Sequence, residues 1–323
     1  MQKRLVGISM VKNEADIIEA SVRHNLRYLD HLIVFDHASS DATPAILTAL
    51  KAEGLALTVL SARVADPRFA QHEQMTQLAR MAFVDQSADW LFALDADEFL
   101  QCASRAALEG ALDRPGEGLW QLRWRTYVAQ DGAIDPNPLQ RLRWRVEADP
   151  RDEGKIVLGR AAVAAGEWFI GPGNHWLIRK ERDEFVAVKG AAVPDVRLAH
   201  LPLRSPQQLI AKALIGWLSA RMVYETGKET SPFAWHWRDL YQRILRGEAI
   251  GDAEVRNYAI DIYALNRSPA NDGANTSYSL VEDIWLDPPA LKHTPPEAID
   301  PARLLAAWSS LLVDRALPLL RRN

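Results

Sequence analysis

Carboxylate side chains stand directly after two apolar runs in the first hundred residues. Asp95, Asp97 and Glu98 follow the run WLFAL, and Asp36 closes the run HLIVFD. No glycine-rich phosphate loop, neither G-x-G-x-x-G nor G-x-x-x-x-G-K-S/T, follows the first apolar run, LVGISMV, which weakens the dinucleotide-binding and P-loop interpretations. A site that presents carboxylates and must hold phosphate without such a loop needs a divalent cation. Mg²⁺ or Mn²⁺ bridges carboxylate and diphosphate oxygens and neutralises charge on a leaving group.

The elements that position these carboxylates alternate between strand and helix. The apolar runs have no polar face, and the segments between them repeat apolar residues at helical spacing. Buried strands that alternate with helices are typical of an α/β fold, a mainly parallel sheet flanked by helices, whose ligands bind beyond the carboxyl ends of the strands. We expect strands over 5–11, 31–36, 55–60 and 90–94, and helices that begin at an Asn13 cap, at a Thr43 cap followed by Pro44, and at Gln74.

The chain changes character after the first hundred residues and again near residue 205. Alternating sequence and turn signals predict three further strands, over 119–128, 140–146 and 155–163, with a turn at Asp131-Gly132. Two helical faces follow, separated by a loop-like segment over 268–296: Leu209, Ala213 and Trp217, then Leu304, Trp308, Leu311 and Leu312. The sequence therefore predicts a domain over 1–205 and a mainly helical C-terminal extension over 206–323.

Composition excludes several classes of protein. The 323 residues include 38 basic and 42 acidic side chains, for a net charge of −4, which argues against a dedicated nucleic-acid binder. The single cysteine, Cys102, rules out an intramolecular disulfide and a cysteine-rich zinc site. No apolar segment is long enough to span a membrane and no signal peptide is evident, so we expect a cytoplasmic protein. The C-terminal helices would pack against the domain over 1–205, or alternatively their basic end, Arg321-Arg322, would contact the inner face of the membrane. Eleven tryptophans predict an aromatic core or an aromatic pocket wall.

Three motifs resemble glycosyltransferase family 2 and its GT-A fold. VGISMVKNEADIIEASVRHNL, LIVFDHASSDATPAIL and WLFALDADEFL are similar to the bacterial branch with MVKNE and D-x-D-E-F motifs, most clearly over residues 5–100. The resemblance implies a metal-dependent inverting transfer of a sugar from a nucleotide-sugar donor, UDP-linked by family habit, to an acceptor hydroxyl such as that of a cell-surface glycan. It assigns residues 1–100 to the nucleotide-sugar half and 101–205 to the acceptor half.

The same resemblance assigns donor and metal contacts. Asp36 would contact the nucleotide base, Asp95 the ribose and Asp97 the metal, with His200 as a further ligand that favours Mn²⁺ over Mg²⁺. In an extended segment Asp95 and Asp97 point to the same side. The remaining candidates for donor contacts, several of which could equally cap helices, are Asn13, Glu14, Asp41, Gln74 and Arg125.

Catalytic groups beyond the donor site are less sharply predicted. Lys155 would pair with the departing diphosphate, and His175 would face the acceptor. The base that deprotonates the acceptor hydroxyl stays open among Glu98, Asp135, Glu167 and Asp195. Two alternatives remain. One is a nucleotidyltransferase, whose usual glycine-rich opening loop is absent, and the other is a non-catalytic nucleotide- or carbohydrate-binding module.

Overall fold

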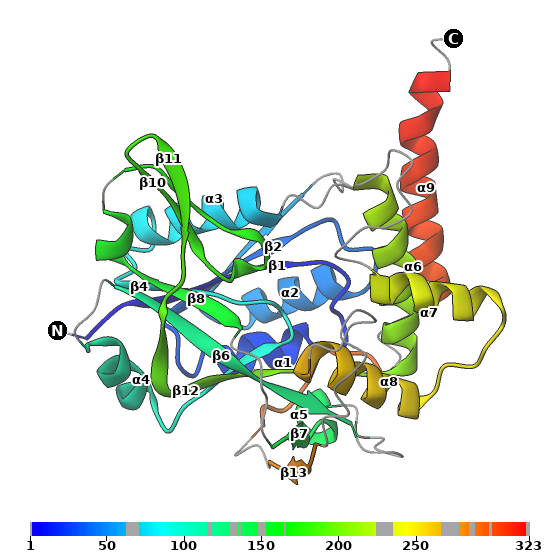
Figure 1. Ribbon diagram of the computed structural model, residues 1–323, viewed down its shortest axis with the longest axis horizontal. Helices are drawn as coiled ribbons and strands as arrows, with labels where there is room; N and C mark the ends of the chain where they lie inside the picture. Colours follow the sequence, from blue (N-terminus) through cyan, green and yellow to red (C-terminus); the bar gives the residue numbers. More distant parts are fainter. Residues whose placement is uncertain are drawn as a thin grey trace.

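The computed structural model describes residues 2–62, 71–114, 118–129, 135, 137–147, 153–164, 166–223, 235–265, 278–283, 288–296 and 299–320. The molecule has an α/β architecture, with a curled central sheet and helices on both of its faces (Figure 1). The fold class predicted from the alternation of strands and helices is therefore confirmed.

Four parallel strands form the half of the sheet that the N-terminal part of the chain supplies. In spatial order they are β3 (Leu57–Ser61), β2 (His31–Asp36), β1 (Leu5–Val11) and β4 (Trp90–Ala93). The bounds of β1 and β2 are those predicted from the sequence. Their carboxyl ends lie at one edge, which brings the segments that follow β1 and β4 together.

Helices cover this half on both faces. Ile8 of β1 joins a core beneath α3 (Gln71–Val84), whereas Leu5 joins the opposite core beneath α1 (Ile18–Asn25) and α2 (Thr43–Ala52). Figure 1 shows α3 on one side of β1 and β2, and α1 and α2 on the other. Because alternate side chains of each strand enter different cores, the strands are apolar throughout.

Later segments extend the sheet mostly with antiparallel neighbours. Outward from β4 these strands are β8 (Gly154–Gly159), β6 (Leu119–Val128), β7 (Trp144–Val146) and β13 (Leu280–Glu282). A short strand, β5 (Glu98–Gln101), pairs with β12 (Ala191–His200), which runs parallel to β6. The β5–β12 register places His200 opposite Glu98, so a residue far along the chain reaches the carboxylate segment after β4. A separate antiparallel sheet contains β9 (Trp168–Ile170), β10 (Leu177–Glu181) and β11 (Glu184–Val188).

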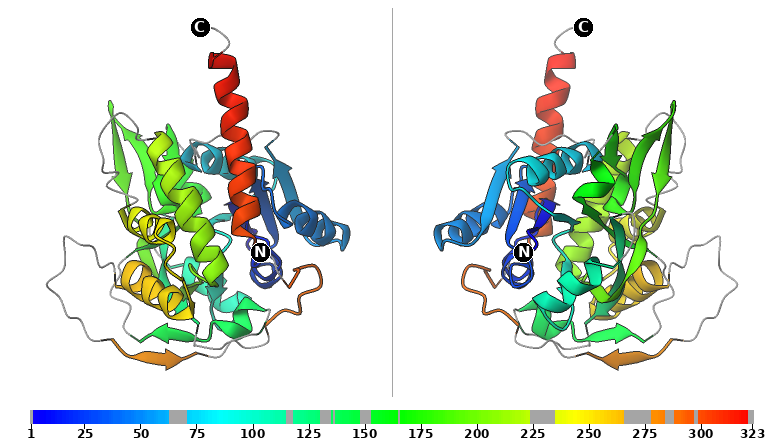
Figure 2. Two further views of the ribbon diagram at one scale, coloured as in Figure 1. Left: turned by 90° about the vertical axis from the view of Figure 1, so that its right-hand side faces the viewer. Right: turned by 90° about the vertical axis from the view of Figure 1, so that its left-hand side faces the viewer.

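The C-terminal part is helical and packs against the sheet. Its described helices are α6 (Pro206–Val223), α7 (Trp235–Leu245), α8 (Asp252–Tyr258), the π-helical turn η3 (Ala259–Ala264) and α9 (Pro301–Leu320). Leu209, Ala213 and Trp217 of α6 are buried, as their helical spacing predicted. Figure 2 shows α9 rising beside α6 and projecting beyond the rest of the molecule. No helix among the described residues is long and apolar enough to cross a membrane.

Several local predictions were wrong. Asn13 does not cap a helix: it has a φ of 57°, its Oδ1 accepts from Ser40 N–H at 2.8 Å, and α1 begins only at Ile18. Thr43 is the first residue of α2 rather than its cap. The expected strand over 140–146 starts as the helix α5 (Pro138–Arg141), capped by the Asn137 side chain, because Pro138 favours a first helical turn.

Two other boundaries also changed. The expected strand over 155–163 ends at Gly159 and continues as the 3-10 turn η1 (Arg160–Val163). The segment over 268–296, predicted as a loop, contributes β13 to the sheet. The turn at Asp131-Gly132, the Leu311 side chain and Arg321-Arg322 lie outside the described residues.

Candidate active site

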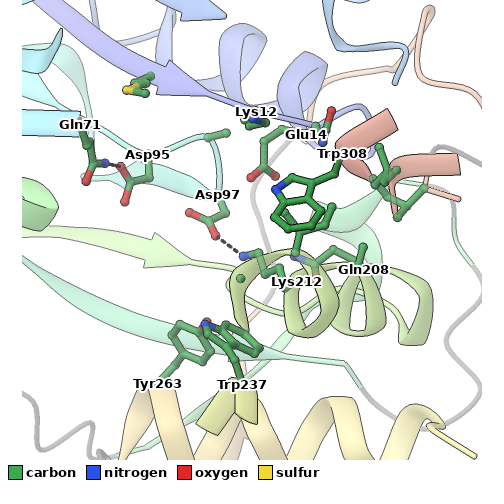
Figure 3. A pocket seen from close by; sticks show the side chains of 18 residues that line it. Lys12, Glu14, Gln71, Asp95, Asp97, Gln208, Lys212, Trp237, Tyr263 and Trp308 are labelled. Atoms are coloured by element: carbon green, nitrogen blue, oxygen red, sulfur yellow. Dashed lines mark hydrogen bonds and ion pairs between the residues drawn. The ribbon is translucent and has the colours of Figure 1, made fainter. Parts of the chain in front are cut away.

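A pocket of about 510 Å³ opens where the carboxyl ends of β1 and β4 meet the C-terminal helices. Its polar wall comes from the segments after the two strands and from α6 (Figure 3). The charged side chains that line it are Lys12, Glu14, Asp95, Asp97 and Lys212. We refer to it as the strand-end pocket. Four of these five residues directly follow strands that the sequence placed at one edge of a parallel sheet.

Asp95 and Asp97 lie on a tight turn between β4 and β5, not on an extended segment as expected. Both nevertheless line the strand-end pocket. Asp95 forms an ion pair with Lys155, and its Oδ1 accepts from Gln71 Nε2 at 3.4 Å and from Asn174 Nδ2 at 3.2 Å. The Asp95 carboxylate is therefore held by three side chains from different elements.

Asp97 lies close to two side-chain cations and an imidazole. Its Oδ2 lies 3.5 Å from Lys212 Nζ, 3.7 Å from Arg204 Nη1 and 4.0 Å from His200 Nε2. Burial would raise the pKa of Asp97, but Lys212, His200 and Arg204 together lower it to about 2. Asp97 therefore stays ionised at every pH at which the protein is expected to work.

Glu98 supports the turn from beneath. Its side chain is fully buried, with Oε2 accepting from Asp95 N–H at 2.9 Å and Oε1 accepting from Trp124 Nε1–H at 2.6 Å. Burial raises the pKa of Glu98 to about 8, although Lys155 acts in the opposite direction. Glu98 does not line the strand-end pocket, so it holds the turn rather than facing a ligand there.

Arg204 ties three distant segments together. Its side chain is fully buried and donates to Glu14 Oε2 at 2.6 Å and to Asp16 carboxylate oxygens at 2.7 and 2.9 Å. Burial raises the pKa of Glu14 to about 7 against the lowering effect of Arg204. The sequence contained the HLPLRS segment but gave no sign that its arginine reaches back to the residues after β1.

The wall opposite the carboxylates is aromatic. Trp237 of α7, Tyr263 of η3 and Trp308 of α9 line the strand-end pocket. Figure 3 shows Trp308 beside Glu14, and the rings of Trp237 and Tyr263 together on the other side of Lys212. Other tryptophans, such as Trp120, Trp124 and Trp217, are buried in the cores. Both interpretations of the tryptophan-rich composition therefore hold for different residues. Residues after 206 therefore supply part of the lining of this pocket.

Several predicted contacts lie away from the strand-end pocket. Asp36 is buried and accepts from Ser39 N–H at 3.2 Å. Asp41 accepts from Thr43 N–H and Ala15 N–H, which orders the start of α2 and the segment before α1. Gln74 does not line the pocket, whereas Gln71, about one turn earlier on α3, does. Position along α3 could not be resolved from periodicity, because both residues are polar.

The predicted catalytic residues also lie away from the strand-end pocket. Lys155 is 2% exposed and donates to Gly173 O at 2.7 Å as well as to Asp95. The His175 Nδ1 lies 2.9 Å from Gly154 O, and its ring meets Trp124 edge-on. None of the predicted catalytic residues lines the strand-end pocket, and neither does Arg125. These catalytic residues are Lys155, His175, Glu98, Asp135, Glu167 and Asp195, of which the last three are exposed.

The donors near Asp97 do not fit the Mn²⁺ or Mg²⁺ ion expected from the sequence. Asp97 and His200 are the two predicted ligands, and Lys212 and Arg204 lie closer to the Asp97 oxygen than His200 does. Within the described parts of the chain, no group of three or more His, Cys, Asp and Glu side chains is placed to hold a metal ion. Both ions take about six ligands in proteins, mostly oxygens, and side-chain cations repel them.

No protein-family model matches the chain, and no curated protein sequence matches it significantly. Among solved structures it is similar to S. aureus TarS 1–349 in complex with UDP, at 9% identity and a TM-score of 0.38, over 75% of this chain and 70% of that chain. It is also similar to the mannosyltransferase PcManGT from Pyrobaculum calidifontis in complex with GDP-Man and Mn²⁺, at 18% identity and a TM-score of 0.38, over 84% of this chain and 78% of that chain. At such low identities and TM-scores, these likenesses establish neither activity nor ligand for this chain.

Proposed function

We propose that this chain is a nucleotide-sugar-dependent glycosyltransferase of the GT-A type, similar to family 2. The observation that carries the proposal is the turn with Asp95 and Asp97, which lies at the carboxyl edge of the parallel sheet and lines a pocket of about 510 Å³. This is the place where open α/β sheets bind their ligands. The motifs after β1, β2 and β4 support the same assignment.

The two walls of the strand-end pocket suit the two parts of a nucleotide sugar. Lys12 and Lys212 offer cations to a diphosphate, and the carboxylates offer acceptors to sugar and ribose hydroxyls. We place the transferred sugar and the acceptor hydroxyl against the aromatic wall of Trp237, Tyr263 and Trp308. A polar ring with apolar faces fits such a wall.

Inverting transfer would need a base beside the acceptor hydroxyl. None of Glu98, Asp135, Glu167 and Asp195 lines the strand-end pocket, whereas Glu14, Asp95 and Asp97 do. A base that acts from the pocket wall would therefore be one of these three. The Mn²⁺ requirement stays an expectation from the family resemblance, and no step of this proposal depends on it.

The test is release of nucleoside diphosphate from a panel of UDP-, GDP- and TDP-linked sugars, with a mixture of simple glycosides as acceptors. We expect release from one donor class, and a loss of about a hundredfold or more in Asp97→Asn, the effect of removing one charged group from an active site. Asp113→Asn, at the exposed end of α4 (Arg105–Leu112), is the matched control.

Absence of release from every donor by the folded protein would contradict the proposal. Tight nucleotide binding without release would instead favour the non-catalytic binding module.

A further inference from the structure

We propose that Lys12 and Lys212, and not a divalent cation, bind the diphosphate of the donor. The inference rests on the proposed function and concerns the same pocket. It departs from the Mn²⁺ ion that the sequence led us to expect, because each carboxylate around the D-x-D turn already has a side-chain cation within 4.0 Å.

The position expected for a metal is taken by nitrogen atoms. A cation between Asp97 Oδ2 and His200 Nε2, which are 4.0 Å apart, would lie beside Lys212 Nζ and Arg204 Nη1, both within 3.7 Å of the same oxygen. An ammonium and a guanidinium at that distance repel a divalent ion strongly in a buried site. These two side chains also neutralise the Asp97 carboxylate, as a metal ion would.

The first carboxylate of the turn already binds three side chains. Asp95 is bound by Lys155, Gln71 and Asn174. Lys155 is itself held by Gly173 O at 2.7 Å, so its charge is fixed beside Asp95. A metal at this carboxylate would have to compete with the buried Lys155 ammonium.

Two neighbouring carboxylates also form ion pairs with a side-chain cation. Glu14 and Asp16 share Arg204 at 2.6 and 2.7 Å. Each of the four carboxylates Glu14, Asp16, Asp95 and Asp97 therefore has a side-chain cation within 4.0 Å.

Lys12 and Lys212 are placed to take over the role of the ion. Lys12 follows β1 and Lys212 comes from α6, and both line the strand-end pocket (Figure 3). Lys212 Nζ uses one donor on Pro202 O at 2.9 Å, and an ammonium has three. Two ammonium groups from different elements can therefore donate to a diphosphate that lies between them. These charge-assisted hydrogen bonds would take the place of bonds from a metal ion to the diphosphate oxygens.

The test is calorimetric binding of UDP and GDP to the full chain, in EDTA and in Mn²⁺, together with Mn²⁺ binding followed by electron paramagnetic resonance. We expect one nucleotide to bind with the same affinity in both buffers, and the protein to leave the Mn²⁺ signal unchanged. Lys212→Gln should weaken diphosphate binding by about ten- to a hundredfold, the effect of one charge-assisted hydrogen bond. Lys51→Gln, at the exposed end of α2, should change nothing.

The outcomes separate this inference from the proposed function. Nucleotide binding that requires Mn²⁺ overturns the role of the two lysines and leaves the glycosyltransferase standing. Absence of nucleotide binding in either buffer overturns both. If Lys212→Gln fails to fold, Lys12→Gln provides the same readout, and an unchanged affinity in a folded Lys12→Gln protein overturns the proposal.

Discussion

Arg204 is the side chain whose removal should cost the fold most, and Arg204→Met is the variant that measures it. The guanidinium is fully buried and makes three hydrogen bonds of 2.6 to 2.9 Å to Glu14 and Asp16, about 190 residues earlier in the chain. Removing one partner of a buried ion pair leaves the other charge uncompensated, which costs about 3–5 kcal/mol. Because two carboxylates lose their partner here, we expect a loss of free energy of unfolding at the upper end of this range.

The pH dependence gives the same variant a second signature. Without Arg204, the folded-state pKa of Glu14, which burial raises to about 7 in the wild type, rises further above its unfolded value. A carboxyl with a raised folded pKa contributes stability at low pH that is lost as the pH rises. The difference between wild type and variant should therefore be larger at pH 7.5 than at pH 5.

Urea denaturation followed by tryptophan fluorescence measures both effects. Arg243→Met is the control, because it removes a partly exposed pair with Glu248 at 2.8 Å and should cost about 1 kcal/mol or less. A loss below about 1 kcal/mol in Arg204→Met, or a loss that does not depend on pH, would refute the view that this arginine holds the segment after β1 in place.

Three further variants test other parts of the account. Because burial raises the pKa of Glu98 to about 8, wild-type stability should fall as the pH rises from about 4.5 to 8, and Glu98→Gln should flatten this part of the urea-denaturation profile. Trp308→Ala should weaken binding of the nucleotide sugar about tenfold, or 1.4 kcal/mol, and leave the nucleoside diphosphate unaffected in calorimetry, whereas equal losses would place Trp308 beside the nucleotide. Gly154→Ala should destabilise the protein by more than about 1–3 kcal/mol in urea, because its Cβ would lie 1.9 Å from the Leu122 carbonyl oxygen, and a melting curve like that of wild type would contradict the β6–β8 packing.

The sequence predicted the elements whose signals are local. The exact bounds of β1 and β2 follow from runs with no polar face, and β6 (Leu119–Val128) follows from its alternation. The buried face of α6 was visible in the spacing of Leu209, Ala213 and Trp217. The placement of Asp95 and Asp97 at the carboxyl edge of the sheet, where they line a pocket, followed from the parallel strands, although the turn between them did not.

Contacts between distant segments left no local signal. The reach of Arg204 to Glu14 and Asp16, the approach of Lys212 to Asp97, and the aromatic wall on α7, η3 and α9 depend on how the C-terminal helices pack on the sheet. Helical periodicity identifies a buried face but not its partner. The D-x-D motif likewise does not reveal which cations surround its carboxylates, so the positions of Arg204 and Lys212 beside Asp97 could not be predicted.

The most direct test of the central claim is thermal unfolding of the full chain with a panel of nucleoside diphosphates. At one hundred times its dissociation constant a ligand stabilises the folded state by about 2.7 kcal/mol, which gives a clear shift in the melting temperature. The account predicts a selective shift with one diphosphate that is lost in Asp97→Asn and kept in Asp113→Asn. A folded protein whose melting temperature no nucleoside diphosphate changes, with or without Mn²⁺, would contradict a nucleotide-sugar site in the strand-end pocket.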